Sequence, residues 1–160
     1  MCSIIGYRGS AYAAPLLVES LRKMEYRGYD SVGIATMDNG KLLVKKGVGK
    51  VEQVSKTIDL KAMPGQIGIG HTRWATHGRL TNKNAHPHQG CSSEIAVVHN
   101  GIIENYEELK NELIASGHSF KSETDSEVAT IMVYQINQMK RTTTSSDCPI
   151  SSAYCIRSSR

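Results

Sequence analysis

The chain begins with Met1-Cys2-Ser3-Ile4-Ile5-Gly6-Tyr7, in which an apolar run directly follows a cysteine. Residues 3–7 are predicted to form a buried strand, because a short apolar run next to a glycine breaker is typical of one. Removal of Met1 would give Cys2 a thiol and a free α-amine, whose ordinary pKa of about 7.7–8.0 suits a general base. An isolated Met-Cys start is usually without function. The interpretation of Cys2 as a nucleophile at the mouth of a sheet therefore needs support from the rest of the chain.

The composition is that of one globular domain. The chain has 160 residues, of which 39% are hydrophobic, and domains usually contain about 100–200 residues. No apolar run reaches the length of about 18 residues that a membrane span needs, and the N-terminus lacks the regions of a signal peptide. We therefore expect a cytoplasmic protein without a membrane partner. Its four cysteines are expected to be free thiols, because that compartment is reducing.

The charge distribution argues against nucleic-acid binding. The formal net charge is +4, and much of the excess lies in Arg141, Arg157 and Arg160. Elsewhere charges of both signs are mixed, and the basic residues form no stripe interleaved with aromatic ones. Most charges are therefore expected to lie on a solvated surface.

Apolar periodicity predicts strands early and late with helices between them, and therefore an α+β layered fold. A hairpin is predicted where residues 31–37 and 41–46 flank Asn39-Gly40, because Asn-Gly supplies the positive φ angles of a tight turn. The other predicted elements are helices at 15–28 and 51–58, strands at 66–72, 94–99 and 119–122, and two helices opening at capping boxes, Asn105 with Glu108 and Thr124 with Glu127. Leu109, Leu113 and Ile114 are expected to form the core face of the first capped helix.

Two long segments lack periodicity. Residues 73–93 are rich in Asn, His, Gly and Thr, and a loop of this length in a compact domain is usually functional or disordered. Its tryptophan and paired histidines favour function. Residues 141–160 contain a Thr/Ser run and scattered arginines, and are predicted to form a flexible tail. The sequence thus predicts a domain at residues 2–140 and an unrelated low-complexity tail at 141–160.

Three places carry polar side chains suited to chemistry. Arg73 follows a predicted strand, and its planar fork suits a carboxylate. Asn100-Gly101 follows another strand, and an Asn amide with the next N–H can direct two donors at one oxyanion. Asp125 opens a helix, where its carboxylate could bind a ligand ammonium group. Each of the three also has a purely structural interpretation. Arg73 would be an exposed side chain, Asn100-Gly101 an ordinary turn and Asp125 part of a helix cap, so spacing alone leaves the functional and the structural interpretation open.

Six motifs, in this order, resemble the glutaminase domain of glutamine–fructose-6-phosphate aminotransferases. That family consists of class II glutamine amidotransferases with the N-terminal-nucleophile hydrolase fold. The resemblance covers roughly residues 2–140 and implies a four-layer α/β/β/α sandwich, truncated on its C-terminal side. The motifs are Cys2-Ser3-Ile4-Ile5-Gly6, Glu25-Tyr26-Arg27-Gly28-Tyr29-Asp30-Ser31, His71-Thr72-Arg73-Trp74-Ala75-Thr76-His77-Gly78, Asn84-Ala85-His86-Pro87-His88, His99-Asn100-Gly101-Ile102-Ile103-Glu104-Asn105 and Ser122-Glu123-Thr124-Asp125.

The resemblance implies a role for each matching residue. Cys2 would attack the side-chain amide of L-glutamine with its α-amine as base, and Asn100 with Gly101 would form the oxyanion hole. The implied substrate-binding residues are Arg73 for the α-carboxylate, Asp125 for the α-ammonium, Thr76 and His77 in the pocket, and Trp74 between the pocket and a passage for ammonia. Arg27 and His86 lie in matching motifs and are expected to support the site. No cofactor is implied, and the ammonia would serve a sugar-phosphate isomerase domain absent from this sequence.

Two departures from the family pattern keep other functions open. Ser3 stands where the family has glycine, and its β-carbon is expected to crowd the oxyanion hole or restrict the backbone. The matching region also ends before the family's last strands. The alternatives are a non-enzymatic fragment that keeps the pocket, and the glutaminase of another class II amidotransferase such as amidophosphoribosyltransferase.

A metal site is a further alternative, at His86, His88 and Cys91. Borderline-soft ions accept these ligands, but the spacing fits none of the common paired zinc patterns. We therefore expect no metal. The sequence leaves open whether the chain forms a homodimer.

The first prediction concerns processing. The mature chain should begin at Cys2, because the proposed base exists only as a free α-amine. A glutamine analogue with an electrophilic side chain should modify Cys2 and leave Cys91, Cys148 and Cys155 unmodified, as measured by peptide mass spectrometry. Full activity of a chain whose intact mass includes Met1 would rule out this mechanism.

Overall fold

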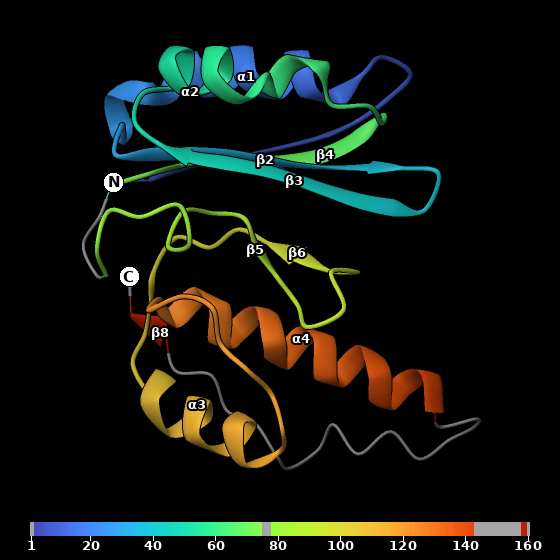
Figure 1. Cartoon of the computed structure of the whole chain (residues 1–160), viewed down its shortest axis with the longest axis vertical. Helices are drawn as coiled ribbons and strands as arrows, with labels where there is room; N and C mark the ends of the chain where they lie inside the picture. Colours follow the sequence, from blue (N-terminus) through green and yellow to red (C-terminus); the bar gives the residue numbers. More distant parts are fainter. Residues whose placement is uncertain (1, 75–77, 143–157, 160) are drawn as a thin grey trace.

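The fold is seen in a computed structural model that describes residues 2–74, 78–142 and 158–159. Four layers stack in the order helices, sheet, sheet, helices (Figure 1). The outer helices α1 (Ala13–Met24) and α2 (Val51–Ile58) cover a four-stranded sheet. Below it lie the two-stranded sheet of β5 (His88–Gln89) and β6 (Ala96–Val97), and then α4 (Asp125–Thr142) and α3 (Tyr106–Ala115). The predicted α+β sandwich with α/β/β/α layers is therefore confirmed, with a second β-layer much smaller than the first.

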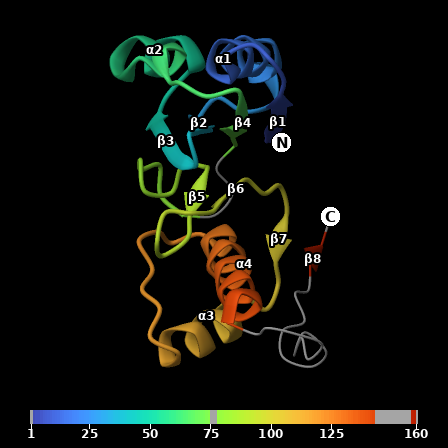
Figure 2. The same cartoon turned by 90° about the vertical axis from the view of Figure 1, so that its right-hand side faces the viewer.

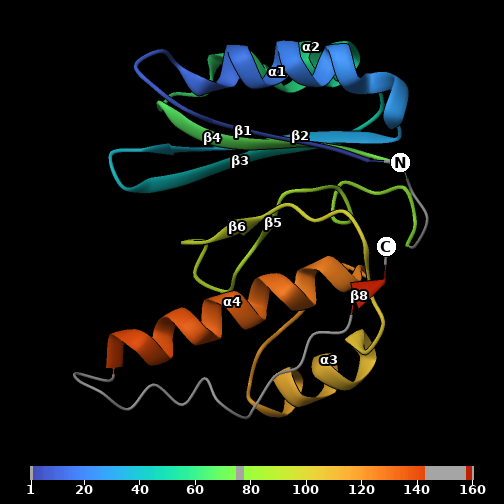
Figure 3. The ribbon, with the colours of Figure 1, turned by 180° about the vertical axis from the view of Figure 1, so that it is seen from behind.

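The upper sheet places the start of the chain beside a central strand. Its order is β1 (Ser3–Arg8), β4 (Ile67–Arg73), β2 (Ser31–Asp38) and β3 (Lys41–Val48), with every neighbouring pair antiparallel. Ser3 pairs with Thr72, so the N-terminus lies at the end of the sheet where β4 finishes (Figure 3). The predicted Asn-Gly hairpin is confirmed, with φ values of 48° at Asn39 and 76° at Gly40.

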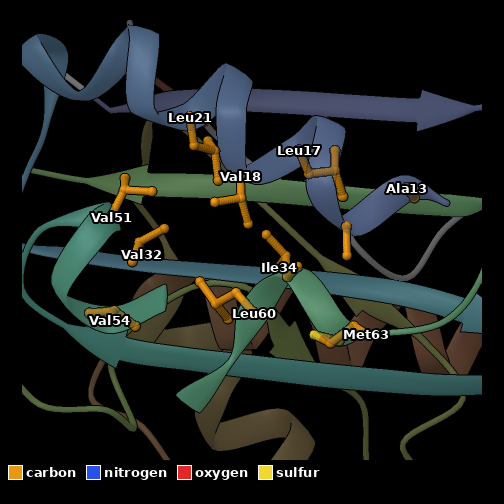
Figure 4. Packing of buried hydrophobic residues seen from close by; sticks show 11 residues of the cluster. Ala13, Leu17, Val18, Leu21, Val32, Ile34, Val51, Val54, Leu60 and Met63 are labelled. Atoms are coloured by element: carbon orange, nitrogen blue, oxygen red, sulfur yellow. The ribbon is translucent and has the colours of Figure 1, made fainter. Parts of the chain in front are cut away.

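The first core fills the space between this sheet and its helices (Figure 4). Helix α1 (Ala13–Met24) continues into the 3₁₀ turn η1 (Glu25–Arg27), and α2 (Val51–Ile58) precedes η2 (Leu60–Ala62). Apolar side chains of the helices pack against those of β2. The residues of this core are all nearly inaccessible to solvent. They are Ala13, Ala14, Leu17, Val18, Leu21, Val32, Ile34, Val51, Val54, Leu60 and Met63.

The second core lies between the lower helices and short strands (Figure 2). The elements are β5 (His88–Gln89), β6 (Ala96–Val97), β7 (Ile102–Ile103), α3 (Tyr106–Ala115) and α4 (Asp125–Thr142). Its buried members are Ile103, Leu109, Leu113, Val128, Ile131 and Met132. Ile114, predicted as core, is instead 51% exposed, because Leu109 and Leu113 already occupy the buried face one turn apart.

Two strand predictions and both capping boxes are corrected. The strand predicted at 94–99 is reduced to Ala96–Val97, and residues 119–122 form no strand. At residues 119–122, the carboxylate of Glu127 accepts hydrogen bonds from the Lys121 and Ser122 backbone N–H groups. A strand would use these groups for pairing. Glu127 thus reaches past Thr124, its predicted partner. In the other box, Asn105 makes no side-chain capping bond.

The C-terminal side contains one element that the sequence did not predict. Ser158–Ser159 forms a two-residue strand, β8, antiparallel to β7. The pairing is built from backbone groups alone, which leave no trace in hydrophobic periodicity. In the described residues, each helix is too short or too polar to cross a lipid bilayer.

Residues 79–90, which we call the central loop, pass directly beneath the upper sheet. A β-carbon on Gly33 of β2 would collide with the His86 carbonyl oxygen and the Lys46 side chain. From the side, Lys46 Nζ donates to the carbonyl oxygens of Ala85 at 2.6 Å and Pro87 at 2.9 Å. The absent side chain at residue 33 and the Lys46 ammonium group therefore set the spacing between the two halves.

The second prediction tests this spacing. Gly33→Ala should lower the free energy of unfolding by about 1–3 kcal/mol or more, because a rigid backbone oxygen must move. Gly6→Ala is the matched control, since nothing lies within 4 Å of a β-carbon at that strand position. It should change stability by less than about 1 kcal/mol in urea unfolding. Equal losses in both variants would show that the close approach does not matter.

Candidate functional site

Cys2 lies at the mouth of the upper sheet, as predicted. It immediately precedes β1 and is partly exposed, so a ligand can reach its sulfur. The Trp74 backbone N–H donates to Cys2 Sγ at 3.2 Å. The residue after β4 therefore holds the Cys2 side chain in place.

Arg73 ends β4 next to Cys2, with only 5% of its surface exposed. Burial lowers the pKa of its guanidinium, while the charges of Cys2, Asp30 and Asp125 raise it. A buried guanidinium can bind a carboxylate through its planar fork, and the nearby acidic groups stabilise its positive charge. Trp74 is 42% exposed, and its ring meets that of Tyr29 edge-on at 5.6 Å between centroids.

Asn100 joins Cys2 from the opposite layer. Its Nδ2 donates to the Cys2 carbonyl oxygen at 3.1 Å, although 98 residues separate the two in sequence. Asn100 Oδ1 lies 2.8 Å from Nε2 of His71, which belongs to β4. Gly101 follows with a φ of 147°, a backbone conformation that a side chain would strain. Asn100 therefore contacts the Cys2 backbone from a constrained turn, and its role with Gly101 as an oxyanion hole stays a prediction.

Asp125 is held by the strand that follows this turn. Its Oδ2 accepts the Ile103 backbone N–H at 2.8 Å, and its Oδ1 accepts the Ser126 hydroxyl at 3.3 Å. The Ser126 hydroxyl also lies 3.2 Å from Nδ1 of His99, the residue before Asn100. Asp125 is thus linked through the Ser126 hydroxyl to His99, the neighbour of Asn100 in sequence. The carboxylate remains partly exposed and available to a ligand cation.

Three buried imidazoles support the site from below the sheet. His71 and His86 stack at 4.2 Å between ring centroids, and His88 meets His86 edge-on at 4.5 Å. Burial lowers the pKa of His71 to about 4 and of His88 to about 3, and places that of His86 well below its usual value. The cluster is therefore neutral at pH 7. His88 Nε2 lies 2.9 Å from the Thr124 hydroxyl, which links the cluster to the segment before Asp125.

A second link ties the central loop to the same segment. Asn84 is buried, and its Oδ1 accepts the Glu123 backbone N–H at 2.9 Å. Its Nδ2 donates to a Glu123 carboxylate oxygen at 3.2 Å and to the Arg79 carbonyl oxygen at 2.9 Å. The position of Asp125 therefore depends on the loop as well as on β7.

The remaining predicted residues have different outcomes. Thr76 and His77 lie outside the described residues, so their roles stay predictions. Arg27 lies on the exposed turn η1, one residue before Gly28, where a β-carbon would meet the Arg73 backbone at 2.9 Å. Ser3 is buried and its hydroxyl donates to the Met24 carbonyl oxygen at 3.3 Å, so its side chain points to the α1 layer rather than towards Asn100.

The alternative metal site is not assembled. Cys91 Sγ lies 3.2 Å from Nδ1 of His118. His86 and His88 belong instead to the buried cluster with His71. Within residues 2–74, 78–142 and 158–159, no group of three or more His, Cys, Asp or Glu side chains is arranged to hold a metal ion.

Sequence reasoning named His86 as a supporting residue but missed His71, His88 and His99. His71 and His99 lie inside the matching motifs, but their partners are 29 and 27 residues away. Periodicity and local spacing carry no signal for such contacts. The available signal was a histidine close before two of the predicted site residues, at 71 before Arg73 and at 99 before Asn100.

This chain is similar to known proteins in sequence and in fold. The family model of the glutamine amidotransferase domain matches residues 59–143. The isomerizing glutamine–fructose-6-phosphate aminotransferases of Pyrococcus horikoshii and Methanococcus maripaludis are 57% and 58% identical over 128 residues, each covering 80% of this chain and 21% of the relative. A solved glutamine phosphoribosylpyrophosphate amidotransferase from B. subtilis covers 93% of this chain and 31% of its own, with 25% identity and a TM-score of 0.69. The chain spans about a fifth of the length of the curated relatives it matches.

The third prediction concerns the buried imidazoles. Their pKa values are lower in the folded chain than the ordinary 6.5, so the unfolded chain binds more protons below that pH. The free energy of unfolding should therefore be highest above pH 6.5 and fall as the pH drops towards 4. Three such groups give a slope on the order of 4 kcal/mol per pH unit. Urea unfolding between pH 7 and 5 measures it.

His88→Gln is the matched variant, because an amide can still bond the Thr124 hydroxyl but does not titrate. The slope of the free energy of unfolding against pH should fall by the contribution of one titrating group, on the order of 1.4 kcal/mol per pH unit. An unchanged slope would show that His88 is not buried as a neutral ring.

Proposed function

Because this chain belongs to the glutamine amidotransferase family, we propose that it hydrolyses the side-chain amide of L-glutamine with Cys2 as the nucleophile. The observation that carries the proposal is the meeting of Cys2, Asn100 and Arg73 from three distant segments. A thiol, an amide donor and a buried guanidinium are the groups that acyl transfer from an amino acid requires.

The reaction proceeds through a thioester. The Cys2 thiol gives its proton to the α-amine and attacks the carboxamide carbon. The resulting oxyanion is stabilised by Asn100 Nδ2 and the Gly101 N–H. Collapse of the tetrahedral intermediate breaks the C–N bond, and the amine's proton leaves with ammonia. Water then attacks the thioester, which releases glutamate and restores the thiol.

Substrate is held at its α-carbon end. Arg73 binds the α-carboxylate through its planar fork, and Asp125 binds the α-ammonium group. Thr76 and His77 complete the pocket wall, and Trp74 covers the side from which ammonia leaves. Arg27 and His86 support the site indirectly, His86 by stacking on His71. Every group comes from one chain, so the chemistry does not require a homodimer.

The aminosugar branch is the context that the relatives favour. The two relatives named glutamine–fructose-6-phosphate aminotransferase that are described above are 57% and 58% identical to this chain, whereas the phosphoribosylpyrophosphate amidotransferase is 25% identical. We place the active domain at residues 2–140 and the tail at 141–160, although α4 continues to Thr142 and Ser158–Ser159 pairs with β7. Ammonia from this domain would serve a sugar-phosphate isomerase partner in the cytoplasm, where the thiol stays reduced.

The fourth prediction tests substrate anchoring. Asp125→Asn should lower kcat/KM for glutamine by roughly 30-fold or more, because one member of a buried charge pair is worth about 2–5 kcal/mol. Asp59→Asn is the matched control, since Asp59 follows α2 on the far layer and its φ of 47° suits asparagine. Asp59→Asn should leave kcat/KM within about threefold of the wild-type value. That is less than half of the roughly 1.4 kcal/mol that corresponds to a tenfold change.

Glutamate release measures both variants, with Cys2→Ala as the blank. Added fructose 6-phosphate should yield no aminosugar, because every assigned residue serves amide hydrolysis. Glutamate release that survives in Cys2→Ala would remove the proposed nucleophile. Asp125→Asn at wild-type kcat/KM would place the ammonium group elsewhere.

A further inference from the structure

His71 contacts the oxyanion donor but is not part of the mechanism given above. It lies on β4 two residues before Arg73, and 1% of its surface is exposed. Its Nε2 is 2.8 Å from Asn100 Oδ1, while Asn100 Nδ2 donates to the Cys2 carbonyl oxygen at 3.1 Å. The Asn100 amide is thus held at both ends.

These two contacts determine where the hydrogen atoms are. The Cys2 carbonyl oxygen can only accept, so the NH₂ end of Asn100 must face Cys2. The amide oxygen then faces His71, so His71 Nε2 must carry the hydrogen. Rotating the amide by 180° would place two carbonyl oxygens against each other and direct its NH₂ group at a ring N–H. One tautomer of His71 and one orientation of Asn100 therefore support each other.

The surroundings of His71 keep its ring in place. The ring stacks on His86, whose own neighbour His88 bonds Thr124. Gly33 lets the central loop approach the sheet closely enough for this stack. Burial also keeps the ring neutral at pH 7, since its pKa is about 4. The ring is consequently a fixed hydrogen-bond donor.

We propose that His71 is a positioning residue that orients the Asn100 amide, so that its NH₂ group points at the oxyanion formed on the substrate of Cys2. The inference rests on the proposed glutamine hydrolysis. A preset donor costs no reorganisation when the oxyanion forms, whereas an amide free to rotate loses that advantage. His71 therefore acts on the transition state and hardly on substrate binding.

The kinetic test compares His71→Leu with His71→Gln. Leucine removes the donor, and kcat should fall by about 10- to 100-fold with KM within about threefold. Glutamine has an amide nitrogen at a similar reach, so it should restore most of kcat. A loss confined to KM, or equal losses in both variants, would overturn the proposal.

A double-mutant cycle separates positioning from general damage. In an Asn100→Ala background the group to be positioned is missing, so His71→Leu should lower kcat by less than about twofold more. Val54→Ala is the control for lost stability, because Val54 is a residue of α2 whose side chain is buried in the first core, away from the site. It should lower the unfolding midpoint while leaving kcat within about twofold in either background. A full additional loss from His71→Leu in the Asn100→Ala background contradicts the positioning role.

An activity-independent measurement distinguishes failure of this inference from failure of the proposed function. Nitrogen-15 NMR of the full chain should show hydrogen on His71 Nε2, and His71→Leu should shift the Asn100 side-chain NH₂ resonances. Hydrogen on Nδ1 instead would overturn the inference even if glutamine is hydrolysed. Absence of glutamine hydrolysis in the wild type, with Nε2 protonated, would instead count against the proposed function.

Discussion

The antiparallel pairing of β1 with β4 is the constraint on which the site depends. It aligns Ser3 with Thr72, so the thiol of Cys2 falls beside Arg73 and against the Trp74 backbone. A shift of one residue would turn Arg73 to the opposite face of the sheet, because side chains alternate along a strand. The positions of Cys2 and Arg73 relative to one another are therefore set by the register of the sheet.

The lower half is brought to this sheet by polar contacts rather than by a shared apolar core. Lys46 holds the central loop through two carbonyl oxygens, and the pKa of its ammonium group is lowered by burial to about 8. The two apolar clusters do not share a member. Hydrogen bonds are directional and hydrophobic contacts are not. The Lys46 contacts therefore constrain the distance between Cys2 and Asn100 more narrowly than hydrophobic packing alone would.

Local patterns predicted the upper half well. Asn39-Gly40 carries its turn chemistry in two residues, and the spacing of Leu17 and Leu21 is that of a helix face. The errors arose where a distant or backward-reaching side chain decided the backbone, as Glu127 does at 119–122. Motif resemblance supplied Cys2, Arg73, Asn100 and the supporting His86, whereas the stacking of His86 on His71 depends on a contact between distant segments that no local pattern predicts.

The hydrogen bond between Asn100 and Cys2 spans 98 positions of the chain, and this has a consequence for biosynthesis. A growing chain exposes its first cysteine long before β4 or Asn100 exists. The first strand can join its sheet only after residue 72 has been made, and contacts this distant in sequence slow folding. Until then the cysteine lacks the Trp74 and Asn100 groups that contact it in the folded chain. The hydrogen bonds that orient this residue are therefore acquired late, when the last of its distant partners has been made.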